Sequence, residues 1–410
     1  MKFRDLGPGL ITGAADDDPS GIATYSQAGA QFGYSLLWTT VFTWPLMSGI
    51  QLVSARIGCA TGRGLAANIR EVFPRPLLLL IVSLLLLANG FNIAADVAAM
   101  GEAMRLVLGG PPGLYSVILV SVCLLLQIFL RYQTYVRYLK WLTLALLSYV
   151  VVVLMVRAPW LQVGRGALFP ALHMDRGMLL MIVAVLGTTI SPYLFFWQAA
   201  QEMEDRRQNG QRAHTVAEAR RQLRRTKWDT IAGMGFSNLV AFFIMASTAA
   251  TLHAGGITDI QTSAQAAEAL RPIGGRLTFL LFSLGIVGTG LLAVPVLAGS
   301  AAYAVAECFD WPTGLDLKLR QARGFYSILI VATLGGLVLD LTPSDPMQEL
   351  LWSALVNGLV AVPIMVVMML LASRPSLMGP FVLAPRLRNV GWLATGVMAL
   401  AGAAMLASLV

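Results

Sequence analysis

Residues 16–21 read Asp-Asp-Asp-Pro-Ser-Gly, so three acids and a helix breaker lie inside an otherwise apolar N-terminal segment. In hydrocarbon a carboxylate costs at least a few kcal/mol unless something pairs with it, and acids there mark cations or water-filled cavities. Proline interrupts a membrane helix at the same point. The run therefore predicts a broken helix that carries a candidate cation site.

The rest of the chain has the composition of a polytopic membrane protein. Of its 410 residues 57% are hydrophobic and 12% charged, whereas soluble proteins carry roughly 25% charged residues. Apolar runs of about 20 residues, the length of one membrane crossing, recur from end to end. We predict eleven spans, centred near Thr24, Pro45, Ile93, Leu124, Leu147, Ile190, Phe242, Val287, Val331, Val360 and Met398.

The basic residues give the topology. With the N-terminus in the cytoplasm, most of the 29 Lys and Arg residues fall on inside segments, as the positive-inside rule requires. We therefore expect an integral protein of the plasma (inner) membrane with its N-terminus cytoplasmic and its C-terminus external. The basic segment 202–227 is expected to lie beside anionic lipid, and we expect no nucleic acid as a partner.

A second break is predicted five spans after the first. Residues 187–192 read Gly-Thr-Thr-Ile-Ser-Pro in the sixth span. Interruptions at corresponding places in two halves indicate an inverted-repeat transporter whose site lies at the breaks. The predicted fold class is all-α, polytopic, with about 11 transmembrane helices in a LeuT-like 5+5 inverted repeat and broken helices 1 and 6. Ordinary proline kinks are the alternative.

This arrangement divides the chain into five parts. Residues 1–157 form the first repeat with spans one to five, and 158–201 hold an external loop and the sixth span. Residues 202–227 are the basic cytoplasmic loop, and 228–372 contain spans seven to ten. Residues 373–410 are a cytoplasmic linker and the eleventh span.

Each break also frees a backbone oxygen. Proline removes the hydrogen bond to the carbonyl four residues earlier. Pro192 is therefore expected to leave the carbonyl oxygen of Thr188 free, and Pro19 that of Ala15.

These segments resemble the Nramp family of divalent-metal transporters, and the Nramp-related magnesium branch most of all. Gly-Pro-Gly at 7–9, Asp-Pro-Ser-Gly-Ile-Ala-Thr at 18–24 and the segment 29–38 are similar to the family's first span, whose break reads Asp-Pro-Gly-Asn. Ile-Ala-Ala-Asp at 93–96 resembles the family's third span. This third-span match and the sixth-span match to the family's Ala-x-x-Met-Pro-His are weaker than that of the first span.

The resemblance implies a metal site at Asp18, Gly21, Thr188 and Ser191, of which Asp18 alone keeps the family's residue. Gly21 stands where the family has an asparagine ligand, and Ser191 stands where it has a methionine. Thioether selects soft metals, whereas carboxylate, carbonyl, hydroxyl and water suit Mg²⁺ and Mn²⁺. The site is therefore expected to take a partly hydrated hard cation.

Three further residues are candidate neighbours of the bound ion: Asp17, Ala15 and Ser20. Consecutive helical positions point in different directions, so Asp17 is expected to bond locally or to contact another helix, and Asp16 is a weaker candidate for the site. An acid inside a membrane protein also serves as a structural partner, which is the alternative reading for both.

The family's proton relay is largely missing. The positions that match its titratable groups are Tyr193 and Gln198 in the sixth span, and Asp96 and Ala99 in the third. Asp96 is the candidate proton site, with a helix-packing acid as the alternative. An inside-negative potential of about 100 mV still supplies roughly 4.6 kcal/mol to an entering divalent ion.

The sequence thus predicts a secondary transporter that imports Mg²⁺, Mn²⁺ or both without proton coupling, functional as a monomer in the lipid membrane. A proton-coupled Mn²⁺/Fe²⁺ symporter and an amino-acid or amine transporter of the same fold are the alternatives. Because His-Glu-x-x-His and Gly-x-Ser-x-Gly are absent from the sequence, we expect no enzyme, and we expect no cofactor.

Overall fold

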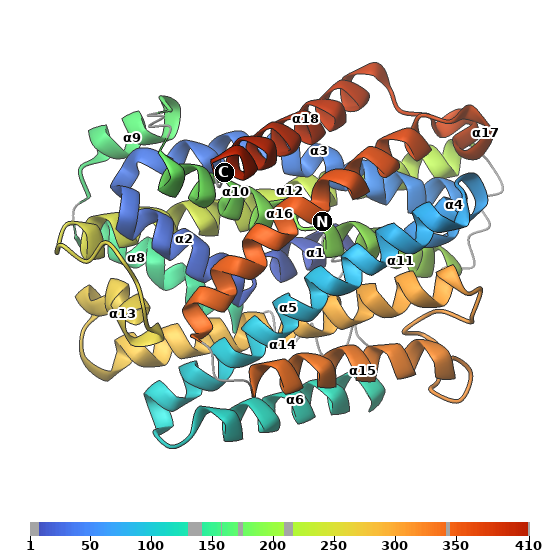
Figure 1. Ribbon diagram of the computed structural model, residues 1–410. Coiled ribbons are helices and arrows are strands. Elements are labelled where there is room, and N and C mark those ends of the chain that lie inside the picture. The colour runs from blue at the N-terminus through green and yellow to red at the C-terminus, as the bar shows by residue number, and fades with distance from the viewer. Residues whose placement is uncertain are drawn as a thin grey trace.

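The computed structural model describes residues 8–129, 142–156, 158–170, 175–208, 216–341 and 345–408. Within these ranges the chain is helical, with short connections, and the helices lie side by side in one bundle (Figure 1). The helices of the first half are α1 (Pro8–Asp16), α2 (Pro19–Phe32), η1 (Gly33–Leu36), α3 (Leu37–Thr61), α4 (Leu65–Val72), α5 (Arg75–Leu108), α6 (Pro112–Phe129), η2 (Thr143–Leu147), α8 (Ser148–Met155) and α9 (Trp160–Leu168).

The second half begins with the sixth span. Its helices are α10 (Arg176–Thr189), α11 (Pro192–Gln208), α12 (Val216–Thr248), η3 (Ala249–His253), α13 (Ser263–Ala267), η4 (Glu268–Ile273), α14 (Gly275–Cys308), α15 (Arg323–Asp340), α16 (Pro346–Ala372), α17 (Pro375–Met378), η5 (Gly379–Phe381) and α18 (Pro385–Ala407). The predicted basic loop is helical at both of its ends, in α11 and α12, while residues 209–215 lie outside the described residues.

The predicted spans can be traced along these helices. Nine helical stretches in the described part of the chain are long and apolar enough to cross a membrane. One of them, Pro19–Thr61, contains the second half of the first span together with the second span. The fifth span is the shorter apolar helix Leu144–Met155. The all-helical fold class is confirmed, and both predicted breaks are present.

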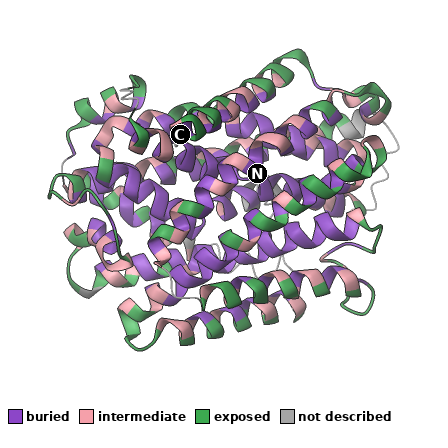
Figure 2. Ribbon diagram, viewed as in Figure 1, coloured by how far each residue is buried: buried purple, intermediate pink, exposed green. Residues whose placement is uncertain are grey.

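The broken helices lie in the interior of the bundle. α1 packs on α12, and α2 packs on α10, α12 and α16, while α5 packs on α14, α15 and α16. Buried residues concentrate in this centre, and exposed residues lie on the outer helices (Figure 2). The exposed side chains include many large apolar ones, such as Leu80, Phe129 and Leu400. An outer surface of this kind suits contact with lipid, since soluble proteins rarely expose large apolar patches.

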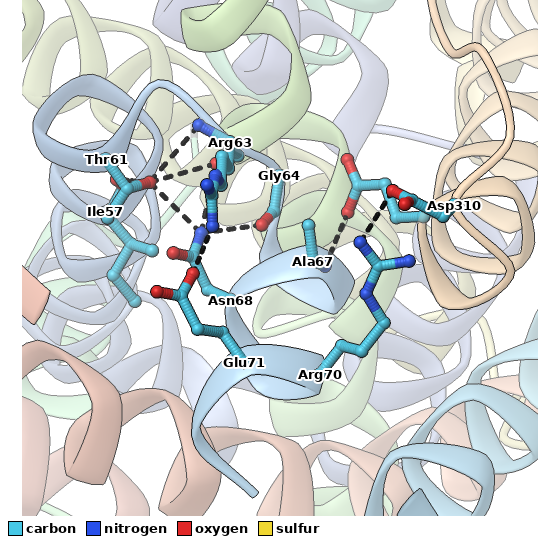
Figure 3. A network of polar contacts seen from close by, with 10 residues as sticks. Ile57, Thr61, Arg63, Gly64, Ala67, Asn68, Arg70, Glu71 and Asp310 are labelled. Atoms are coloured by element: carbon cyan, nitrogen blue, oxygen red, sulfur yellow. Dashed lines mark hydrogen bonds and ion pairs between the residues drawn. The ribbon is translucent and has the colours of Figure 1, made fainter.

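The connection from α3 to α4 is held by a polar network at one end of the bundle (Figure 3). The helix α3 ends at Thr61, and Gly62 has φ +66, the left-handed conformation that glycine adopts without strain. The side-chain amide of Asn68 donates to Thr61 Oγ1 at 3.1 Å and to the carbonyl of Gly64 at 2.7 Å. The turn that brings α4 back across the end of α3 is thereby fixed.

The same short helix is tied to the end of α14. Glu307 Oε2 accepts a hydrogen bond from the backbone N–H of Ala67 at 3.1 Å, in the first turn of α4. A carboxylate at this position favours the helix N-terminus, whose N–H groups lack intrahelical partners. Arg70 of α4 pairs with Asp310 at 2.6 Å, just after α14 ends (Figure 3). The second and eighth spans are therefore linked at this end through α4.

Candidate cation site

The two breaks lie next to each other. α1 ends at Asp16 and α2 begins at Pro19, whereas α10 ends at Thr189 and α11 begins at Pro192. α2 contacts α10, and α1 contacts α11. Four half-helices therefore meet where the sequence placed its acids and hydroxyls.

Asp18 occupies the first break with both carboxylate oxygens engaged. As the N-cap of α2 it accepts, at Oδ1, hydrogen bonds from the backbone N–H of Gly21 and the hydroxyl of Ser20, each at 2.7 Å. An aspartate at a helix N-cap commonly accepts hydrogen bonds from the first turn in this way. Oδ2 accepts from Asn92 Nδ2 at 2.9 Å and lies 3.3 Å from the hydroxyl of Tyr193. Oδ1 thus caps the start of α2, and Oδ2 faces the third and sixth spans.

Gly21, Ser20 and Thr188 surround this carboxylate. A Cβ added at Gly21 would lie 3.2 Å from Thr188 Oγ1 and 3.5 Å from Asp18 Oδ1. Position 21 therefore points between the acid of the first break and the hydroxyl of the sixth. Ser20 Oγ lies 3.4 Å from Thr188 Oγ1. The structure brings these four predicted residues together, and all four are buried.

The two freed carbonyls need a correction. The sequence predicted that the oxygens of Thr188 and Ala15 would lack partners, but each lies within bonding distance of a hydroxyl. Ser191 Oγ donates to the Thr188 oxygen at 2.8 Å, with the Gly187 oxygen at 3.0 Å. Tyr193 OH lies 3.1 Å from the Ala15 oxygen. The physical reason is that a buried carbonyl without a partner costs about 1–3 kcal/mol.

These hydroxyls do not close the site to a cation. A serine hydroxyl has one hydrogen and two lone pairs, so Ser191 Oγ can donate to a carbonyl and still present an oxygen lone pair. A carbonyl oxygen likewise has two lone pairs. The donor set available at the breaks is therefore carboxylate, hydroxyl and backbone carbonyl.

Asp16 and Asp17 contact the seventh span, in line with the expectation for Asp17. The hydroxyl of Ser237 on α12 lies 2.5 Å from Asp16 Oδ2 and 2.9 Å from Asp17 Oδ1. A serine has a single hydroxyl hydrogen, so it satisfies one of these two acceptors at a time. Both acids are buried. The contact ties α1 to α12 directly beside the break.

Asp96 lies one helical turn beyond Asn92 on α5 and is completely buried. Neither of its carboxylate oxygens has a side-chain hydrogen-bond partner in the described part of the chain, and the backbone of Ser20 is among the groups close to it. Two of the other three relay positions, 198 and 99, hold residues that do not titrate. Gln198 donates to Glu202 Oε1 at 3.0 Å, and Ala99 is a buried apolar residue.

A separate cavity of about 780 Å³ lies at the end of the bundle that carries α9. It is lined by Phe32, Tyr34, Arg165 and His253, among others, and none of the described residues that line it is acidic. Its only ionisable groups are thus basic or phenolic, which does not suit a cation. Within the described ranges, no group of three or more His, Cys, Asp and Glu residues is placed to hold a metal ion.

Sequence reasoning missed three residues of this network: Asn92, Ser353 and Asn357. Asn92 Oδ1 accepts hydrogen bonds from the Ser353 hydroxyl and from Asn357 Nδ2, both on α16. The signal for the first was present, because Asn89, Asn92 and Asp96 fall on one face of a very apolar helix. Polar residues at that spacing in a membrane span mark an interior face.

The fold and the paired breaks define a secondary membrane transporter of the LeuT-like class. The chain belongs to the Nramp family, since the family model described as "Natural resistance-associated macrophage protein-like" matches residues 9–408. The family is one of membrane transporters, which confirms that this protein is a transporter and not an enzyme.

Solved structures support the same fold. The Eremococcus coleocola manganese transporter in complex with an aromatic bis-isothiourea substituted compound matches with a TM-score of 0.75 at 20% identity, covering 97% of this chain and 85% of that one. A mutant of that transporter matches with a TM-score of 0.77 at 19% identity and the same coverage. Mhp1, a nucleobase-cation-symport-1 family transporter, matches with a TM-score of 0.53 at 15% identity over 98% and 92% of the two chains.

Proposed function

We propose that this protein imports divalent metal ions, Mg²⁺, Mn²⁺ or both, in partly hydrated form and without proton coupling. The observation that carries the proposal is Asp18, a buried carboxylate held where two broken helices meet, with the hydroxyls of Ser20 and Tyr193 and the amide of Asn92 around it. Asp18, position 21, the Thr188 carbonyl and the Ser191 hydroxyl form the proposed ion site. Ser20, Ala15 and Asp17 are its proposed neighbours.

The choice of metal rests on donor chemistry. Carboxylate, carbonyl, hydroxyl and water oxygens suit Mg²⁺ and Mn²⁺, whereas thioether sulfur selects softer metals. Gly21 adds no ligand of its own, and Mg²⁺ characteristically keeps several waters in protein sites. The similarity to a manganese transporter of known structure agrees with a divalent substrate.

The driving force is the membrane potential. With the proposed orientation, N-terminus cytoplasmic and C-terminus external, a divalent ion moving inward across about 100 mV gains roughly 4.6 kcal/mol. At 1.4 kcal/mol per decade this sustains more than a thousandfold accumulation. Uptake of an abundant ion then needs no proton gradient.

The test is ion uptake into liposomes that contain the purified protein and a Mg²⁺- or Mn²⁺-sensitive dye. Asp18→Ala and the isosteric Asp18→Asn are both expected to abolish uptake, because each removes the only charge among the proposed donors. Glu268→Ala is the matched control, since Glu268 pairs with Arg271 in a partly exposed helical turn far along the chain from the breaks. Normal uptake by the Asp18 variants would refute the proposal.

A proton-coupled symporter is the second candidate, and one observation favours it. Asp96 is buried without a side-chain partner in the part of the chain described, close to the backbone of Ser20. A pH-sensitive dye in the same liposomes separates the two candidates. Acidification that accompanies metal entry and disappears in Asp96→Asn would establish the symporter.

A further inference from the structure

Asn92 connects the candidate site to the tenth span through a single amide. Its Nδ2 donates to Asp18 Oδ2 at 2.9 Å. Its Oδ1 accepts from the Ser353 hydroxyl and, at 3.3 Å, from Asn357 Nδ2. All four side chains are buried. The amide therefore has Asp18 on one side and two α16 side chains on the other.

Ser353 and Asn357, the two α16 side chains that bond to Asn92, can each donate or accept a hydrogen bond. A hydroxyl both donates and accepts, and a carboxamide does so as well. Asn357 Oδ1 is buried and has no hydrogen-bond partner among the described residues. If the Asn92 amide rotates by half a turn, its Nδ2 faces the hydroxyl oxygen of Ser353 and the amide of Asn357. Both can accept a hydrogen bond from it, because Asn357 Oδ1 is not otherwise used within the described part of the chain. The reversed orientation thus keeps its partners on α16.

Asp18, on the other side of Asn92, can bond to it in only one direction. A carboxylate accepts and does not donate, so it favours Asn92 Nδ2 facing it while the site holds no cation. With Oδ1 turned inward, two oxygens would face each other. That arrangement becomes favourable when a divalent cation lies between them, since amide and carboxylate oxygens are both ligands for hard cations. The cation itself would select the reversed orientation.

We propose that Asn92 supplies the amide oxygen ligand that position 21 lacks in this chain. The inference rests on the proposed function and deepens it, because it adds a residue of the third span to the ion site. The amide oxygen comes from α5, whereas the residue at position 21 lies in the first turn of α2. Reversal of Asn92 also changes its bonds to Ser353 and Asn357, so ion occupancy is transmitted to α16.

The experiment is calorimetric titration of the purified full-length protein with Mn²⁺ and with Mg²⁺. Asn92→Leu removes both amide atoms, whereas Asn92→Asp keeps the oxygens and removes the donor. Gly21→Asn in the Asn92→Leu background moves the amide back to the first span. Asn89→Leu is the matched control, because Asn89 is a buried asparagine of the same helix that donates to the Leu297 carbonyl and to Ser300 on α14.

Asn92→Leu is expected to weaken Mn²⁺ and Mg²⁺ binding by about 10- to 100-fold, as loss of groups around a metal site does. Asn92→Asp is expected to keep binding, and Gly21→Asn is expected to restore it in the Asn92→Leu background. Asn89→Leu is expected to bind as the wild type does. If Asn92→Leu does not fold, Asn92→Asp decides the matter alone, because a residue that only donated to Asp18 would become repulsive there.

Two failures are distinguishable. If the wild type binds neither ion, or if Asp18→Ala binds as well as the wild type, the proposed function fails. If Asp18→Ala loses binding while Asn92→Leu keeps it, the function stands and the Asn92 inference is overturned. Loss of binding in Asn92→Asp equal to that in Asn92→Leu overturns it too, because Asn92 would then act only as a donor that positions Asp18.

Discussion

The hydroxyl of Tyr193 lies 3.3 Å from Asp18 Oδ2, and this contact joins the break of the sixth span to the break of the first. The same hydroxyl is 3.1 Å from the carbonyl oxygen of Ala15. A tyrosine has one hydroxyl hydrogen, so the two acceptors share it. The residue that replaces the family's relay histidine thus has a structural function between the two broken helices.

Removal of this hydroxyl should destabilise the protein. In Tyr193→Phe the buried Ala15 oxygen loses its hydroxyl partner, which is expected to lower the free energy of unfolding by about 1–3 kcal/mol. Denaturation of the purified protein in detergent measures the change. Tyr115→Phe is the control, because the Tyr115 hydroxyl bonds to the Gly109 carbonyl on the exposed surface and its loss should matter little. Equal stability of Tyr193→Phe and wild type would contradict the argument.

The positions of the breaks could be predicted because their signals are local. Pro19 and Pro192 each interrupt a helix at their own place in the sequence, and the apolar runs give the spans without knowledge of their partners. Helical geometry predicted that Asp17 would bond locally or contact another helix, and the structure shows the second of these outcomes. That its partner would be Ser237 did not follow, because the two lie 220 residues apart.

The sequence analysis missed other residues of the site because their hydrogen-bond partners lie on distant spans. Asn92, Ser353 and Asn357 meet only because α5 packs on α16, and one sequence does not reveal which helices are neighbours. The prediction of free carbonyls at Thr188 and Ala15 was wrong for a related reason. Proline does remove the backbone donor, but the chain supplies hydroxyls from Ser191 and Tyr193 in its place.

The contact between Ser237 and the acids Asp16 and Asp17 should be important for stability. Ser237→Ala leaves both buried carboxylates without this donor, and the expected loss is about 1–3 kcal/mol of unfolding free energy. Adding Asp16→Asn should recover part of it, because the amide removes one of two adjacent like charges and brings its own N–H groups. Unfolding in denaturant measures both changes.

Ser247→Ala is the matched control for this prediction. Ser247 is also a buried serine of α12, but its hydroxyl donates at 2.9 Å to the Ile244 carbonyl of its own helix. Its removal is expected to have a small effect. If the two serine variants unfold alike, Ser237 has no special role.

Metal preference should follow the residue at position 191. Ser191→Met places a thioether beside the Thr188 carbonyl and is expected to raise the affinity for Cd²⁺ relative to Mn²⁺ by about tenfold, or 1.4 kcal/mol. Competition binding with both ions measures the ratio. Ser191→Ala removes the same hydroxyl without adding sulfur and should not favour Cd²⁺. A wild-type protein that already binds Cd²⁺ far more tightly than Mn²⁺ would show that position 191 does not set the preference.

The dependence of uptake on potential and pH tests the driving force. Relay positions 193, 198 and 99 hold a phenol that bonds to the first break, an amide bonded to Glu202, and an apolar side chain. A relay needs groups that exchange protons near neutral pH, and none of these three does so. Mg²⁺ uptake into liposomes should therefore rise with an inside-negative potential and change little with a pH gradient at fixed potential.

The Asp96→Asn variant tests whether Asp96 takes part in proton transport. Asp96 can bind a proton, but the matching relay positions give it no titratable neighbour to which the proton could pass. The variant should therefore keep the same dependence of Mg²⁺ uptake on potential, and neither protein should acidify the liposome lumen. Proton influx in a fixed ratio to metal in the wild type, lost in Asp96→Asn, would mean that the buried carboxylate near Ser20 carries the proton by a route that does not use Tyr193 or Gln198.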